Sequence, residues 1–367
     1  MTPRRSRGRR LVLVAVAALA LVLAACSEVK NNGQNSLEPK GPQAQKIYDL
    51  FVPILIIAIV VGIAIIVATV FLAVRFRYKK GTNENPKQVH GNTRLEIGWT
   101  VIPALLLAII AVPTVATIFD LAENPGPSAL QVTVEGKQWW WQFSYPDAKV
   151  VTADEMVIPT GRDVFVKLTA CDPKTGPTVT CNVIHSFWVP ELAGKKDVVP
   201  GQTNTLTLNA DKPGTYLGQC AEYCGLAHAD MRMRVVAQEP ADYQAWVKSQ
   251  QAQSTKEAAL EAGVNNATYG CASCHSFKAG TPGAVAPNLT HLADRTAFAG
   301  DKYLMNFDNL WKWIYDAPSR KPMGKLIQHM PNFSAANMTQ AEAKKIACFL
   351  LENTATTPSS PPECAGQ

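Results

Sequence analysis

The loop Cys220-Ala-Glu-Tyr-Cys224-Gly-Leu-Ala-His228-Ala-Asp-Met231 places two thiols, an imidazole and a thioether within one short stretch of chain. Such soft donors select copper in electron-transfer sites. A further histidine, His185, lies upstream in a Val-Ile-His-Ser-Phe-Trp segment, and we expect it on a different loop. A structural disulfide or a zinc site would not need the methionine. The combination therefore predicts a copper centre formed by this loop and His185.

Short β-type segments on both sides of the loop predict a β-sandwich or barrel over residues 122–240. Apolar and polar residues alternate in these segments, and Pro and Gly residues separate them, as is typical of such folds. Clear examples are Leu130–Val134, Val164–Leu168, Thr205–Leu208 and Met233–Val236. Because Thr215–Gly218 precedes the loop and Met233–Val236 follows it, we expect strands to hold both of its ends.

A separate motif, Cys271-Ala-Ser-Cys274-His275, is the attachment pattern of a c-type haem. The two cysteines alone could be a redox dithiol, but the histidine that follows can serve as the proximal iron ligand. Both thiols can then form thioethers to the haem vinyl groups. Helical segments surround the motif, so residues 265–355 are predicted to form a helical haem domain. A helix and tether at 241–264 precede it, and a tail at 356–367 follows.

The N-terminus has the pattern of a secretory signal peptide over residues 1–25. Five arginines precede an apolar run from Leu11 to Ala25, and Leu23-Ala-Ala-Cys26 resembles the bacterial lipobox, in which the cysteine is lipidated. An uncleaved anchor with an incidental cysteine is the alternative. Loss of these arginines leaves 30 basic and 29 acidic residues, so the formal net charge falls from +6 to about +1. Nothing in this balance indicates nucleic-acid binding.

Two apolar runs, Leu50–Val74 and Trp99–Leu121, are each long enough to cross a bilayer as a helix. They predict a transmembrane hairpin over residues 47–121, after a polar linker at 26–46. The loop between the runs carries six basic residues and two acidic ones, so the positive-inside rule places it in the cytoplasm. The lipidated N-terminus and everything after Leu121 then lie on the outer face of a bacterial cell membrane.

The nine cysteines divide among these expectations. Cys26 is assigned to lipid, two cysteines to copper and two to haem. Two local pairs remain, Cys171 with Cys181 and Cys348 with Cys364. Because an exported chain can keep disulfides, we predict a bridge within each pair. Free buried thiols are the alternative for each.

From Leu50 to Met233 the chain resembles subunit II of the haem-copper cytochrome c oxidases. The resemblance rests on the copper loop and on the segments His90-Gly-Asn92, Leu95-Glu-Ile-Gly-Trp-Thr-Val-Ile-Pro103 and Gly136-Lys-Gln-Trp-Trp-Trp-Gln-Phe143. It implies a two-helix membrane hairpin followed by a cupredoxin-like β-barrel. With a cytochrome c segment at its C-terminus, the chain resembles the caa3-type members of the family.

The resemblance also implies that the copper centre is the dinuclear site called CuA. Cys220 and Cys224 would bridge the two copper ions, and His185 and His228 would each bind one. The remaining ligands would be Met231 on one copper and the main-chain carbonyl of Glu222 on the other. The Glu222 side chain would contribute to a magnesium site at the interface with subunit I.

Further residues have counterparts in the family. Trp139 stands where an exposed aromatic residue admits electrons to CuA in the family. The alternative is a core position, and it should hold for at least one residue of Trp139–Trp141, because neighbouring side chains on a strand face opposite ways. Glu96 stands where a glutamate lies at the mouth of a proton-uptake path into subunit I, with a solvated interfacial charge as the alternative. Asn182 and Ser144 replace acidic residues that are associated with docking a basic soluble cytochrome c, which argues against that docking mode.

The C-terminal segment resembles the class I cytochromes c, in which a segment like Pro287-Asn-Leu289 offers a backbone carbonyl to the proximal histidine, here His275. The sixth iron ligand in that family is a methionine, and Met330-Pro331 fits its distal pattern. Met323 is the runner-up. The other side chains with suitable chemistry are Met305, Met338, His291 and His329.

These features predict an electron-transfer subunit of a terminal oxidase. Electrons would pass from an external donor, a cytochrome c or a bc-type complex, through haem c, the Trp139 region and CuA to subunit I. Oxygen would be reduced to water there, with proton pumping, in a complex with further oxidase subunits. The alternative from another class is a copper-delivery membrane lipoprotein, which has no use for a haem. A quinol-oxidase subunit would lack Cys220 and Cys224, and a nitrous oxide reductase would need more than six histidines.

Overall fold

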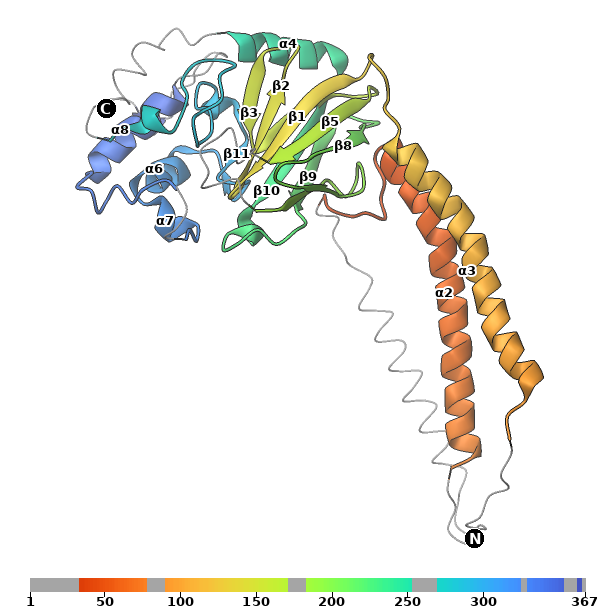
Figure 1. The fold of residues 1–367 in the computed structure, drawn as a ribbon. Helices are drawn as coiled ribbons and strands as arrows, with labels where there is room; N and C mark the ends of the chain where they lie inside the picture. The colour runs from red at the N-terminus through yellow and green to blue at the C-terminus, as the bar shows by residue number, and fades with distance from the viewer. Residues whose placement is uncertain are drawn as a thin grey trace.

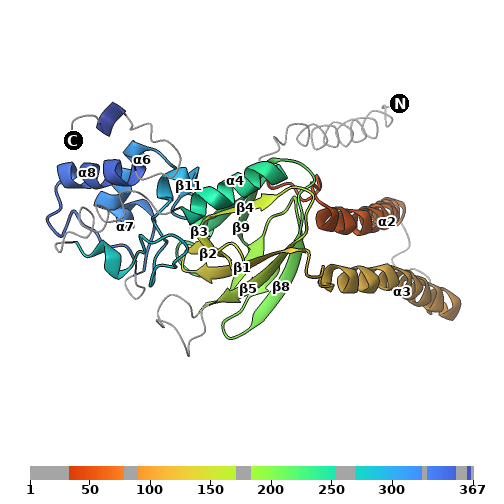
Figure 2. The same ribbon diagram turned by 90° about the horizontal axis from the view of Figure 1, so that it is seen from above.

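The computed structural model describes residues 33–77, 90–170, 183–252, 269–324, 329–352 and 362–364. They form a pair of long helices, a β-domain of two sheets and a C-terminal domain with short helices (Figure 1). The helical pair and the C-terminal domain lie on opposite sides of the β-domain in both views (Figures 1 and 2). The predicted signal peptide, Cys26 and the Cys171–Cys181 pair lie outside the described residues.

Helices α2 (Pro42–Arg75) and α3 (Thr93–Ala122) run side by side and contain the two predicted apolar runs (Figure 1). Both are long and apolar enough to cross a membrane. Their large apolar side chains are widely exposed, and Val112 and Phe119 are each 73% exposed. An apolar surface of this extent marks a membrane or protein contact. The predicted helical hairpin is confirmed.

The start of α2 and the end of α3 contact each other, and the start of α2 also contacts the β-domain. Lys46 Nζ lies 2.7 Å from Asp120 Oδ2, which joins the start of α2 to the end of α3. The amide of Ala44 donates to the carbonyl of Leu192 at 3.2 Å, and Ala44 is buried. Helix α2 begins before the predicted apolar run because its first turns pack on the β-domain.

The β-domain contains two five-stranded sheets. The order in one sheet is β3 (Val150–Ala153), β2 (Trp140–Tyr145), β1 (Leu130–Lys137), β5 (Val164–Ala170) and β8 (Thr203–Leu208). The order in the other is β4 (Glu155–Pro159), β10 (Arg232–Gln238), β9 (Gly214–Cys220), β6 (His185–Trp188) and β7 (Lys196–Val198). Strands β1 and β5 pair in parallel, as do β10 and β4, and the other pairs are antiparallel.

The two sheets enclose one apolar core, as the alternating segments predict. Residues on β1 alternate between buried and half-buried along most of the strand, because successive side chains of a strand face opposite sides. The ring of Tyr145 is fully enclosed, and its hydroxyl donates to the carbonyl of Val157 at 2.9 Å and accepts from the Val157 amide at 2.8 Å. These bonds fix β2 against β4 of the other sheet. The predicted cupredoxin-like architecture is thus confirmed as a two-sheet sandwich.

Helix α4 (Pro240–Gln251) follows the last β-domain strand and covers one side of the β-domain (Figure 2). The C-terminal domain is built from helices α6 (Phe307–Tyr315), α7 (Ala317–Arg320) and α8 (Gln340–Leu351) and the short 3₁₀ helices η2 (Cys271–Ser273), η3 (Leu292–Asp294) and η4 (Pro362–Cys364). The predicted disulfide between Cys348 and Cys364 is present and ties η4 to α8.

The C-terminal domain also contains two short strands, which the sequence analysis did not predict. Strands β11 (Ala297–Phe298) and β12 (Tyr303–Leu304) form a two-stranded ribbon. Strands of two residues are too short to show the alternation from which a strand is predicted. The turn that connects the two strands contacts the β-domain through Gly300 and Lys302.

Candidate metal and haem sites

The copper loop lies between two paired strands, as predicted. It leaves β9 at Cys220 and enters β10 at Arg232, and the amide of Cys220 donates to the carbonyl of Met231 at 2.9 Å across its base. Within the loop, η1 (His228–Asp230) turns the chain back toward β10. Gly225 has a φ of +115°, a conformation that glycine adopts without strain.

His185 reaches the loop through strand pairing. It begins strand β6 rather than lying in a loop, and β6 pairs with β9 so that Phe187 is opposite Cys220. The amide of Ala221 donates to the carbonyl of Ser186 at 2.9 Å and extends this contact into the loop. The imidazole of His185 is fully buried. Strand register therefore brings together residues that are 35 positions apart.

The predicted donor atoms converge on the two sulfurs. Cys220 Sγ and Cys224 Sγ are 3.9 Å apart, which is too far for a disulfide bond. Cys220 Sγ lies 3.8 Å from His185 Nδ1 and 3.2 Å from the carbonyl oxygen of Glu222. Cys224 Sγ lies 3.6 Å from His228 Nδ1 and 3.8 Å from Met231 Sδ. Each sulfur thus has two further donors close by.

The electrostatics of the thiol pair favour a bound cation. The contact with Cys224 is the main cause that lowers the pKa of the Cys220 thiol, and the same contact raises the pKa of Cys224. The pair therefore loses one proton readily and holds the other. A soft cation between the sulfurs would stabilise the second thiolate as well. The donor set and its charge fit copper.

Trp139 connects the copper loop to the C-terminal domain. Its indole Nε1 donates to the carbonyl oxygen of Cys224 at 3.0 Å, and the Gln138 side chain donates to the same oxygen at 2.7 Å. The family resemblance implies an exposed aromatic residue here, but Trp139 is only 4% exposed. The C-terminal domain covers it, and the sequence pattern of the β-domain alone contains no sign of that cover.

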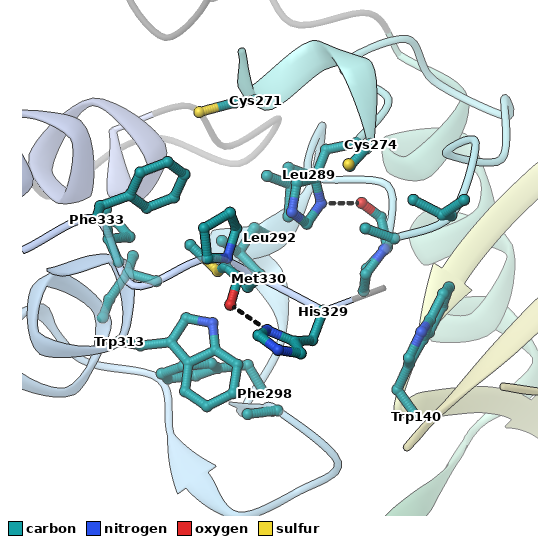
Figure 3. A pocket seen from close by; sticks show the side chains of 18 of the residues that line it. Trp140, Cys271, Cys274, Leu289, Leu292, Phe298, Trp313, His329, Met330 and Phe333 are labelled. Atoms are coloured by element: carbon teal, nitrogen blue, oxygen red, sulfur yellow. Dashed lines mark hydrogen bonds between the residues drawn. The ribbon is translucent and has the colours of Figure 1, made fainter. Parts of the chain in front are cut away.

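A cavity of about 230 Å³ lies in the C-terminal domain and is closed on one side by the β-domain. Cys271, Cys274, His275 and Met330 line it together with apolar side chains, and Trp140 of β2 contributes to its wall (Figure 3). In Figure 3 the two cysteines lie along one edge and Met330 lies across from them. Both cysteines are free thiols, as thioether formation requires.

The orientation of His275 suits a proximal iron ligand. Its Nδ1 is hydrogen-bonded to the carbonyl of Pro287 at 2.7 Å, which confirms the contact predicted for this segment. The other ring nitrogen is left for a metal. Burial lowers the pKa of His275 and so favours the neutral imidazole that binds iron. The residues present fit a covalently attached haem.

The candidates for the sixth ligand of the haem iron differ in whether they line the cavity. Met330 lines the cavity, and so do Met323, Met338 and His329. Met323 also packs against the β-domain core, whereas Met338 is buried in the core of the C-terminal domain. The His329 ring nitrogen Nδ1 is bonded to the Met330 carbonyl at 2.9 Å. His291 and Met305 do not line the cavity.

None of the remaining predicted residues that the structure describes lines the cavity, and only the Glu222 carbonyl is among the donors around the two sulfurs. Glu96 is exposed in the first turn of α3, where the Asn92 side chain accepts hydrogen bonds from the amides of Arg94 and Leu95. Glu222 is exposed on the copper loop, and its carboxylate accepts from the Tyr223 amide at 3.2 Å. Ser144 lies on β2. Asn182 lies outside the described residues.

The sequence pattern did not predict that two charged residues, Asp154 and Lys321, are buried. Asp154 is 5% exposed and Lys321 is 3% exposed, and they lie on opposite sides of the contact between the domains. Burial raises the pKa of Asp154 and lowers the pKa of Lys321 to about 8. An isolated charged residue in a loop carries no periodic signal, so only the fold reveals that these two are buried.

The fold and the two sites define a membrane-anchored electron-transfer protein with a copper-type donor cluster and a haem-attachment domain. Family models support each part. "Cytochrome C oxidase subunit II, transmembrane domain" matches residues 30–117, "Cytochrome C oxidase subunit II, periplasmic domain" matches 130–238, and "Cytochrome c" matches 260–354. The chain belongs to the cytochrome c oxidase subunit II family and carries a C-terminal cytochrome c domain. These domains imply that copper and haem c are its cofactors.

Two individual relatives carry the name of this family, and a third is a quinol oxidase subunit. The chain is 39% identical over 329 residues to cytochrome c oxidase subunit 2 of Alkalihalophilus pseudofirmus, covering 87% of this chain and 92% of the relative. It is 34% identical over 347 residues to the protein of the same name in Bacillus subtilis, covering 89% and 93%. A quinol oxidase subunit 2 of Bacillus cereus is 36% identical over 226 residues, covering 60% of this chain and 74% of the relative.

Among solved structures, the periplasmic domain of subunit II of cytochrome oxidase of Bradyrhizobium japonicum is 29% identical. The match covers 34% of this chain and 94% of that one, with a TM-score of 0.30.

Proposed function

We propose that this chain is the electron-transfer subunit of a caa3-type terminal oxidase. It passes electrons from its own haem c through a dinuclear CuA centre to subunit I, where oxygen is reduced to water with proton pumping. One observation carries the proposal: Trp139 lines the cavity beside the haem-attachment motif and also donates a hydrogen bond to the carbonyl of Cys224. The neighbouring Gln138 makes the same two contacts, so these adjacent side chains link the cavity wall to the copper loop.

For the copper centre, we assign Cys220 and Cys224 as the two thiolates that would together hold the copper ions. The donor atoms within 3.9 Å of one or the other sulfur support this assignment. Those donors are His185, the Glu222 carbonyl, His228 and Met231. A copper pair held in this way would supply a one-electron relay, and the strands at both ends of the loop would keep its geometry nearly constant.

For the haem, we assign Cys271 and Cys274 as the residues that would attach it covalently, and His275 and Met330 as the side chains that would bind its iron. The bond from His275 to the Pro287 carbonyl supports the proximal assignment, because it orients the ring. Position in the cavity and the Met-Pro sequence support Met330. Trp139 then serves as the route from haem to copper within the chain, rather than as an exposed receiver of electrons from a separate protein.

Two carboxylates are proposed to act toward subunit I. Glu96 would take up protons at the cytoplasmic end of α3, where its exposure leaves it open to water. The exposed Glu222 side chain would help to bind magnesium at the subunit interface. We also propose that Cys26 is lipidated and that the β-domain and haem domain face the outside of the cell membrane. The external donor would be a cytochrome c or a bc-type complex.

The deciding experiment measures the copper and haem content of the purified full chain together with its electron paramagnetic resonance spectrum. The expected result is two copper ions and one covalent haem c per chain, with the spectrum of a mixed-valence copper pair. A colourless protein that exchanges copper with chelators would instead support a copper-delivery lipoprotein. A Cys220–Cys224 disulfide with no metal bound in the exported protein would contradict both.

A further inference from the structure

The turn between β11 and β12, residues 299–302, reaches from the haem domain onto the β-domain. The amide of Gly300 donates to Asp154 Oδ2 at 2.7 Å, and the carbonyl of Gly300 accepts from the Arg232 amide at 3.0 Å. The next two residues of the turn form ion pairs with the β-domain, one between Asp301 and Arg234 and the other between Lys302 Nζ and Asp230 Oδ2 at 2.6 Å.

Lys321 crosses the same interface from a different direction. Its ammonium donates to the carbonyl of Trp139 at 2.6 Å and to the carbonyl of Ala299 at 2.8 Å. One carbonyl belongs to the β-domain and the other to the turn of the haem domain. Trp139 in turn donates from its indole to Cys224. A hydrogen-bonded chain therefore runs from Lys321 through Trp139 to the copper loop.

The burial of these polar groups marks a specific contact. One oxygen of Asp154 accepts from the Trp141 amide within the β-domain at 2.9 Å, and the other accepts from Gly300 across the interface, so both oxygens of this buried carboxylate are hydrogen-bonded in the docked arrangement. A buried charge without such partners is strongly unfavourable. Gly300 leaves no spare room, because a Cβ built there would lie 2.3 Å from the Asp230 carbonyl oxygen.

We propose that the turn 299–302, Asp154 and Lys321 form a docking latch that holds the haem domain against Trp139, and that Lys321 is a positioning residue for electron transfer between haem c and CuA. In that transfer one electron passes from ferrous haem c to the oxidised copper pair, and no bond forms or breaks. The role in electron transfer rests on the proposed function, whereas the docking does not. Electron transfer then takes place while the haem domain is docked on the β-domain.

The docking is tested by hydrogen exchange on the full chain with its cofactors, without any measurement of electron transfer. The variant is Gly300→Ala, and the matched control is Gly201→Ala. Both glycines have a φ of +75°, but a Cβ at Gly201 meets nothing within 4 Å. The two positions are therefore matched in φ, and only the Cβ added at Gly300 pushes against the β-domain.

The reporters are the amides of Arg232 and Thr296, because both donate hydrogen bonds across the interface. We expect Gly300→Ala to accelerate their exchange at least tenfold and Gly201→Ala to leave it unchanged. Exchange at the wild-type rate in Gly300→Ala, or equal acceleration in the two variants, would overturn the latch.

The positioning role is tested by photoreducing haem c in the full chain with a ruthenium complex and following the electron to copper. We expect Lys321→Met to slow the transfer at least tenfold, because small misplacements of redox partners are costly, while the haem and copper spectra stay unchanged. The control is Lys312→Met, which removes a half-exposed lysine paired with Asp308 on the same domain. Its rate should equal that of the wild type.

An unchanged transfer rate in Lys321→Met would overturn the positioning role. If that variant does not assemble with its cofactors, Gly300→Ala replaces it, and an unchanged rate there has the same meaning. A wild-type chain that shows no copper-pair spectrum or no haem c would refute the proposed function instead. The hydrogen-exchange result would still decide whether the domains are docked.

Discussion

Met231 places its sulfur 3.8 Å from the sulfur of Cys224, whereas Met233, two residues further on, lies in the same core without a place among the donor atoms. Both side chains are fully buried. The pair therefore separates the effect of a ligand from the effect of a buried thioether that only fills space.

We predict that Met231→Leu changes the copper resonance spectrum and leaves the haem absorption intact, because leucine fills the space without a donor atom. Met233→Leu is the matched control and should leave both spectra as they are. Each substitution conserves volume and should cost less than about 1.5 kcal/mol of stability. A copper spectrum that is altered equally in the two variants would show that Met231 acts by packing alone.

The sixth haem ligand is tested by replacing each candidate methionine with histidine. We expect Met330→His to keep the haem attached and to lower its midpoint potential by on the order of 0.1 V, a fraction of the ~0.8 V range that axial ligands set. Met323→His, which lines the same cavity, should leave the potential near the wild-type value. Redox titration followed by absorption measures both, and the reverse pattern would exchange the two assignments.

The disulfide between Cys348 and Cys364 closes a loop with a sequence separation of 16. A loop of that size corresponds to about 3 kcal/mol of stabilisation in the chain-entropy description. We therefore expect replacement of both cysteines by alanine to lower the unfolding free energy of the haem domain by about that amount, as measured by denaturant titration of the haem absorption. An unchanged midpoint would mean that the bridge contributes nothing to folding.

Tyr145 has an effect on stability that depends on pH. Its hydroxyl bonds to both backbone groups of Val157, so Tyr145→Phe should cost roughly 1–3 kcal/mol at neutral pH by leaving them unsatisfied. Burial raises the pKa of Tyr145 well above 10.0. Above pH 10 the unfolded chain therefore releases the proton while the folded chain keeps it, and stability falls as pH rises.

The two parts of this prediction are checked by denaturant unfolding of the β-domain between pH 7 and about pH 11, followed by tryptophan fluorescence. The decline above pH 10 should be less steep in Tyr145→Phe than in the wild type, because the phenyl ring has no proton to lose. Parallel curves for the two proteins would refute a raised pKa for this residue.

The sequence alone determined the parts that depend on short stretches of chain. The copper loop and the Cys271–His275 motif each hold their donors within a few residues, so spacing is sufficient to recognise them. The apolar runs, the alternating strands and the Cys348–Cys364 pair are local in the same sense. The sequence pattern also placed the loop correctly between two strands, because the flanking segments adjoin it.

Only the tertiary structure decided how these parts meet. Strand pairing of β6 with β9 brings His185 to the loop, and docking of the haem domain buries Trp139, which the family pattern leaves exposed. The contact from Lys321 to Trp139 joins residues 182 positions apart, and the contact from Asp154 to Gly300 joins residues 146 apart. Such contacts have no periodic signature, because the partners of a buried charge are set by the packing of two domains and not by its neighbours along the chain.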